Sequence, residues 1–132
     1  MTYWKDSLLV GVTLIDEEHR KLVGAIDELM AACLAGKGRT VIGKTLSFVV
    51  SYTKKHFSDE EKLQTQHNYP GIIAHKKLHA LFIENITALE KDFEQNGANV
   101  ALIGKINKTL VDWLVQHINV EDKKLGAFIN SK

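Results

Sequence analysis

The chain has 132 residues, which is enough for one domain with a substantial hydrophobic core. Hydrophobic residues make up 45% of it and charged residues 25%, and the net charge of +1 argues against a partner that is nucleic acid or an anionic membrane. Cys33 is the only cysteine, so an internal disulfide is excluded and a reducing, cytoplasmic location is expected.

Residues 1–15 are predicted to form an N-terminal arm. Apolar side chains should pack this arm onto the rest of the chain: Trp4, Leu8, Leu9, Val12 and Ile15. The apolar segment 7–15 is short and lacks a small-residue cleavage site, so we do not interpret it as a signal peptide. No apolar run approaches the roughly 20 residues that a membrane-spanning helix needs.

Two helices are predicted in the first half of the chain. The first should be capped by Asp16 and ended by Gly36 and Gly38. Cys33 lies late in it and is expected to be buried. The second should span residues 40–67, because Asn68-Tyr69-Pro70-Gly71 is a strong helix break.

A third helix is predicted over residues 72–94, before Asn96-Gly97. The fourth carries apolar residues at helical spacing up to His117, and a short tail helix should follow through Phe128. Four such helices with short connections predict an all-α fold, an up-down-up-down antiparallel four-helix bundle. We expect one domain over residues 1–132, with the bundle at 16–120 and a C-terminal tail at 121–132.

Six of the most informative side chains form three spaced pairs. They are His56 with Glu60, His75 with His79, and His117 with Asp122. Residues four apart share one helix face, so the first two pairs each aim two ligand groups at one point. In the predicted topology all three pairs and His19 lie at the same end of the bundle.

This end of the bundle is predicted to bind metal. A lone histidine on an apolar helix face is most often a core or surface residue, but histidines that converge from four helices point to a shared ligand. Five imidazoles and two carboxylates are too many for one tetrahedral zinc ion and suit two six-coordinate ions with bridging carboxylates. The chain lacks the H-E-x-x-H motif of zinc proteases, because Lys76 follows His75, and it lacks the Glu-x-x-His motif of ferritin-like di-iron bundles.

The pair His117 and Asp122 needs a local distortion. Five residues of a regular helix leave two side chains about 140° apart, so we predict an irregularity between Ile118 and Asp122. The alternative is that residues 121–124 are only a solvated charged stretch. His67 lies eleven residues after His56, or roughly 16 Å along a helix, and is therefore excluded from the site.

The ligand pattern resembles the hemerythrin family, and most closely its single-domain bacterial branch. The resemblance covers nearly the whole chain. It includes Trp4, Val10-Gly11-Val12, Ile15-Asp16-x-x-His19, His56-Phe57-x-x-Glu60-Glu61, Tyr69-Pro70 and Trp113-Leu114-x-x-His117-Ile118. No ligand position of the family is missing.

This resemblance implies a non-haem di-iron centre that binds dioxygen reversibly, for storage, delivery or scavenging. One iron would be held by His75, His79 and His117, and the other, five-coordinate iron by His19 and His56. Glu60 and Asp122 would bridge them together with an oxo or hydroxo group, and oxygen would bind as hydroperoxide. The oxygen pocket would be lined by Leu22, Phe57, Trp113, Leu114 and Ile118, whose alternative role is ordinary core packing.

Other functions remain open at this stage. The same centre could serve an oxygen or redox sensor acting on a separate partner, or an enzyme that reacts with nitric oxide or peroxide. A purely structural bundle with an incidental metal is a further alternative. We expect a monomeric oxygen-binding protein that is not an enzyme, with dioxygen as its partner.

Overall fold

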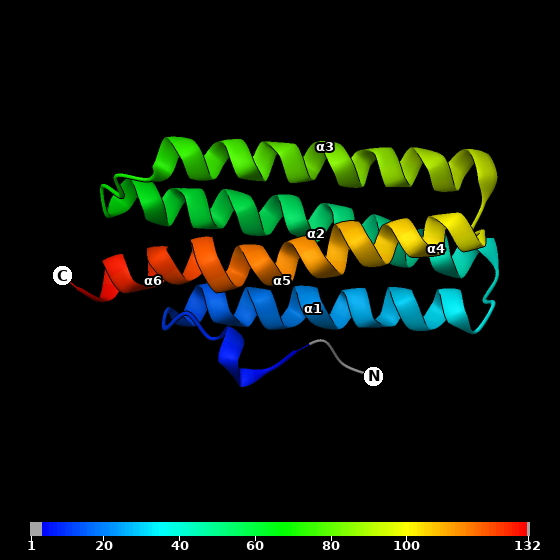
Figure 1. Ribbon diagram of the computed structural model, residues 1–132, viewed down its shortest axis with the longest axis horizontal. Helices are drawn as coiled ribbons and strands as arrows, with labels where there is room; N and C mark the ends of the chain where they lie inside the picture. Colours follow the sequence, from blue (N-terminus) through cyan, green and yellow to red (C-terminus); the bar gives the residue numbers. More distant parts are fainter. Residues whose placement is uncertain (1–3, 132) are drawn as a thin grey trace.

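The computed structural model describes residues 4–131, and those residues contain helices and no strands. Four helical rods run antiparallel to their neighbours in sequence, which confirms the predicted up-down-up-down bundle (Figure 1). The first three rods are α1 (Thr13–Leu34), α2 (Arg39–Gln66) and α3 (Ile72–Asn96). The arm, with its short helix η1 (Asp6–Leu8), lies alongside the beginning of α1.

The fourth rod is continuous but not uniform. It consists of α4 (Val100–Ile106), the π-helical segment η2 (Asn107–Asp112), α5 (Trp113–His117), the π-helical segment η3 (Ile118–Asp122) and α6 (Lys123–Asn130). The irregularity predicted between Ile118 and Asp122 is confirmed, because the wider π turn occupies those five residues. The predicted short C-terminal helix is confirmed as α6, which continues the rod directly.

Two sequence-based predictions about the beginning of α1 are wrong. Asp16 does not cap the helix, because α1 begins at Thr13 and Asp16 lies within its first turn. Its carboxylate instead accepts the backbone N–H groups of Val10 and Gly11 at 2.7 and 3.1 Å. Leu9 is 43% exposed and does not pack onto the bundle, whereas the other predicted arm residues do: Trp4, Leu8, Val12 and Ile15.

A small correction also applies to the connection between α1 and α2. Gly36 has a positive φ of 65°, which favours glycine, and it follows the end of α1 as predicted. Gly38 was also predicted to end α1, but it is the N-cap residue of α2, immediately before the first turn of that helix.

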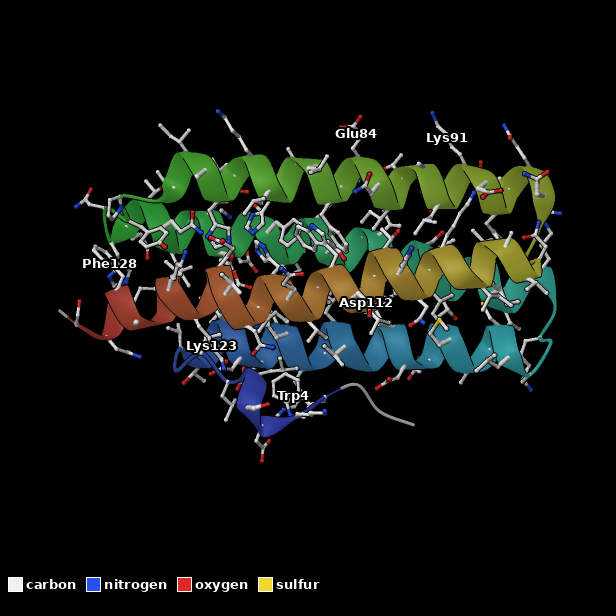
Figure 2. The ribbon with its side chains drawn as sticks, viewed as in Figure 1. Trp4, Glu84, Lys91, Asp112, Lys123 and Phe128 are labelled. Atoms are coloured by element: carbon white, nitrogen blue, oxygen red, sulfur yellow. The ribbon has the colours of Figure 1, made fainter. Side chains whose placement is uncertain are left out.

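The two ends of the bundle differ in polarity. Aliphatic and aromatic side chains fill the end where α1 finishes, with Leu29, Ile86 and Leu102 fully buried. Cys33 lies among them as predicted, and burial raises the pKa of its thiol. The charged side chains of Glu84 and Lys91 instead lie on the outer face of α3 and point away from the bundle (Figure 2).

The other end is closed by α6 and by the connection between α2 and α3. The ring of Phe128 packs edge to face on Tyr69, with 5.2 Å between the ring centroids. Among residues 4–131, no helix is both long enough and apolar enough to cross a membrane.

The turn into the fourth rod gives a test of the fold. The side chain of Asn99 accepts the backbone N–H of Leu102 at 2.8 Å, an N-cap bond at the start of α4. Asn99→Ala should lower the free energy of unfolding by about 1 kcal/mol, measured by urea denaturation. Asn107→Ala, at an exposed position inside the rod, is the matched control and should not destabilise the chain, since alanine favours helix. Equal effects of the two substitutions would contradict the assigned cap.

Candidate metal centre

The structure brings all seven predicted ligands together inside the bundle, at the end where α1 begins and α2 finishes. Each rod contributes at least one of them. None is more than 4% exposed: His19, His56, Glu60, His75, His79, His117 and Asp122. His67 is partly exposed at the end of α2 and takes no part in this cluster, as its spacing predicted.

The ligand atoms form two overlapping groups within which all atoms lie within 4.8 Å of one another. One group contains three imidazoles and two carboxylates: His75, His79, His117, Glu60 and Asp122. The other contains the remaining two imidazoles and the same two carboxylates: His19, His56, Glu60 and Asp122. Because each carboxylate belongs to both groups, the arrangement suits a pair of ions that share two bridges.

Distances between ligand atoms match those around a six-coordinate ion. With bonds of about 2.1 Å, neighbouring ligand atoms of such an ion are about 3.0 Å apart. His19 Nε2 lies 2.9 Å from Asp122 Oδ2, and His75 Nε2 lies 3.1 Å from Glu60 Oε1. His75 Nε2 and His117 Nε2, which repel each other unless one carries a proton or both face a cation, are 3.0 Å apart.

The same atoms lack the partners that buried polar groups normally have. Several have no hydrogen bond of acceptable geometry and face the centre of the cluster: Nε2 of His19, His56 and His79, both carboxylate oxygens of Glu60, and Oδ1 of Asp122. Leaving so many buried donors and acceptors without partners is strongly unfavourable. A bound cation would satisfy all of them at once, so the residues fit a metal centre.

The outer nitrogens of three imidazoles are held by side chains that the sequence analysis did not identify. His56 Nδ1 donates to Glu18 Oε1 at 2.8 Å, and His79 Nδ1 donates to Glu61 Oε2 at 2.9 Å. His75 Nδ1 lies 3.0 Å from the amide nitrogen of Gln64, whose oxygen has no partner, and rotating this amide by 180° would let the oxygen accept from His75 Nδ1. These contacts direct Nε2 of each ring toward the centre.

One of these partners was within reach of sequence reasoning. Gln64 is four residues after Glu60 and so shares its buried helix face. Glu18 was not, because it reaches His56 on another helix, 38 residues away. Lys55 also bonds Glu18 at 3.0 Å and thereby balances the charge of this nearly buried carboxylate.

Protonation in the cluster is governed by contacts between imidazoles and carboxylates. Burial alone would lower the pKa of His56, but the carboxylates of Glu18 and Glu60 raise it to about 10. Burial likewise opposes protonation of His75, whose pKa Asp122 and Glu60 raise to about 9. Burial and repulsion by the carboxylate of Asp122 would raise the pKa of Glu60, but the surrounding imidazoles lower it to about 2.

The predicted pocket residues lie beside the cluster. Two of them, Phe57 and Trp113, stack on ligands of the three-imidazole group, although the pocket was predicted on the side of His19 and His56. The ring of Phe57 stacks on His79 with 3.8 Å between centroids, and the ring of Trp113 stacks on His117 at 4.6 Å. Leu22, Leu114 and Ile118 are fully or almost fully buried. Phe82 completes the aromatic layer by stacking on Trp113, with 4.2 Å between the ring centroids.

Comparisons with known proteins agree with this geometry. The family model described as hemerythrin HHE cation binding domain matches residues 10–129. A bacteriohemerythrin of Stenotrophomonas maltophilia is 32% identical over 120 residues, covering 91% of this chain and 76% of the relative. A bacteriohemerythrin of Pseudomonas aeruginosa is 34% identical over 90% of this chain and 75% of its own. A myohemerythrin of Sipunculus nudus is 31% identical over 92% of this chain and 88% of its own.

The raised imidazole pKa values predict that metal binding releases protons. Without metal, His56 and His75 are protonated at pH 7.5, because their pKa values of about 10 and about 9 lie above that pH. Ligation requires neutral imidazole, so binding of Zn²⁺ should release about two protons per chain. Calorimetric titrations in buffers of different ionisation enthalpy measure this number.

Two substitutions at neighbouring positions test the cause of that release. Glu18→Gln should reduce it, since the pKa of His56 falls, whereas Glu17→Gln at an exposed position should not. Binding enthalpies that do not depend on the buffer would contradict this description of the site.

The ion pairs that His56 and His75 form with neighbouring carboxylates also stabilise the metal-free fold. This stabilisation is complete below pH 6.5 and is lost as the pH rises through 9 to 10.

Proposed function

The chain belongs to the hemerythrin family, and from this premise we propose that it binds dioxygen reversibly at a non-haem centre of two iron ions. Storage, delivery or scavenging of oxygen would follow from such binding. The observation that carries the proposal is the pair of overlapping ligand groups that share Glu60 and Asp122. We also propose that the whole chain forms one domain and acts as a monomeric binding protein, not as an enzyme.

The two groups differ in ligand number, and this difference is central to the proposal. His75, His79 and His117 would hold one iron, and His19 and His56 would hold the other. Glu60 and Asp122 would bridge the two ions. Because the second group supplies one imidazole fewer, dioxygen would bind on the side of His19 and His56. When bound, the ferrous pair supplies the electrons for reversible binding of dioxygen.

The chain's own side chains would protect this chemistry from water. Leu22, Leu114 and Ile118 are at most 1% exposed, and each lies within three residues of His19 or His117 along its helix, so we expect them to exclude water there. Exclusion of water removes proton donors that would promote loss of a reduced oxygen species. The rings of Phe57 and Trp113 would hold His79 and His117 in a fixed orientation by stacking on them.

An optical and metal assay of a single sample tests the proposal. The chain is loaded with ferrous iron without air, exposed to oxygen and then purged. We expect two irons per chain and visible absorption that appears with oxygen and disappears on its removal. Irreversible conversion to a ferric form would favour a redox sensor or an oxidase-like role. Absence of iron after loading would mean that the ligand assignment or the metal is wrong.

The hydrocarbon lining gives a second, independent prediction. Leu114→Ala should keep the iron but speed oxidation of the ferrous pair by about tenfold, because the cavity that it leaves admits water. The decay of the oxygenated form, followed by absorption, measures this rate.

Leu110→Ala is the matched control for this substitution. Leu110 is equally buried, lies one turn earlier in the same rod and leaves a comparable cavity. It should lower the free energy of unfolding similarly without changing the oxidation rate. Equal oxidation rates in the two variants would remove the protective role assigned to Leu114.

A further inference from the structure

The N-terminal arm crosses α6 at a place where only glycine fits. A Cβ atom on Gly126 would overlap the backbone carbonyl oxygen of Val10 and lie 3.0 Å from its carbonyl carbon. Both partners are backbone, so neither can move aside as a flexible side chain would. The close approach therefore depends on the absence of a side chain at Gly126, inside a helix where glycine is otherwise unfavourable.

The same two arm residues are bonded to helices on both sides. On α1, the carboxylate of Asp16 accepts the N–H groups of Val10 and Gly11. At the end of α6, the side chain of Asn130 donates to the carbonyl oxygen of Gly11 at 3.1 Å. Gly11 has a positive φ of 89°, a conformation that favours glycine, so the backbone turns here to meet both helices.

These contacts lie one helical turn outside the metal centre. Asp16 is three residues before His19 on α1, and Gly126 is four residues after Asp122 in the fourth rod. His19 Nε2 and Asp122 Oδ2 are themselves only 2.9 Å apart. The arm therefore joins the same two rods that this ligand pair joins, at the adjacent turn. Figure 2 shows Trp4 of this arm beside α1.

We propose that the arm positions the metal centre. Val10, which packs on Gly126, and Gly11, which is bonded to Asn130, hold α6 at the distance from α1 that His19 and Asp122 need to share an ion. Gly126 is a positioning residue, since it acts through Asp122 and touches no ligand atom of the centre. The inference rests on the proposed function only in taking His19 and Asp122 as metal ligands. Coupling is reciprocal, so bound metal stabilises the docked arm as the arm stabilises metal binding.

Two glycine substitutions test the proposal with Co²⁺ as the probe. Gly126→Ala displaces the arm, whereas Gly104→Ala adds the same methyl group to an exposed helical position with no atom within 4 Å. Both gain the same helix propensity. Gly126→Ala should weaken Co²⁺ binding by about tenfold and change the intensity of the visible Co²⁺ bands. Gly104→Ala should match the parent in both respects.

A second pair of variants serves if Gly126→Ala does not fold, as judged by circular dichroism. Asn130→Ala removes the bond to Gly11 from an exposed position eight residues after Asp122. Asn96→Ala removes a local bond to Asp92 at the other end of the bundle. Co²⁺ affinity and band intensity should change only in Asn130→Ala, by about threefold in affinity, since one exposed hydrogen bond is lost.

Limited trypsin digestion supplies a readout that does not depend on the metal's spectrum. Cleavage after the exposed Lys5 should slow when Zn²⁺ is added to the parent, and Gly126→Ala should lose this protection. Unchanged Co²⁺ affinity and bands in both arm variants would overturn the positioning role while leaving the metal centre intact. A parent chain that binds neither Co²⁺ nor iron would instead overturn the proposed function, and this inference with it.

Discussion

The rest of the structure depends on the burial of two carboxylates within a few ångströms of each other, which is unfavourable in free energy. Glu60 and Asp122 are 0% and 1% exposed, and both are found in each ligand group. Buried charges of like sign are stable only when nearby cations compensate them. Protonated imidazoles do so in the metal-free chain, and metal ions would do so in the loaded one. His56 and His75, whose pKa values are raised, therefore have a role in both states.

The bundle meets this requirement at the expense of regular helix geometry in one rod. Ordinary i, i+4 spacing on α2 and α3 brings His56 to Glu60 and His75 to His79 without distortion. The fourth rod must present His117 and Asp122 together, which a regular helix cannot do, and η3 is the wider turn that results. Its continuation, α6, then receives the arm.

A further set of side chains decides how the imidazoles point. Glu18 and Glu61 add two carboxylates to the two that the ligand spacing revealed, each bonded to the outer nitrogen of a ligand histidine. Such bonds fix the tautomer and make the ring a more basic ligand. Lys55 balances the charge of Glu18, so Glu61 is the carboxylate of this set that adds negative charge near the centre, which favours the retention of cations.

By itself, the sequence determined which histidines and carboxylates converge, the helical fold and the irregular turn before Asp122, because these follow from spacing along a helix of known pitch. Turn-forming residues also predicted the breaks at Pro70 and Gly97. Only the tertiary structure decided that Glu18 bonds His56, that Asp16 fastens the arm and that Gly126 seats Val10. Each of these contacts joins residues from different elements, and spacing within one helix carries no information about how far apart two helices lie.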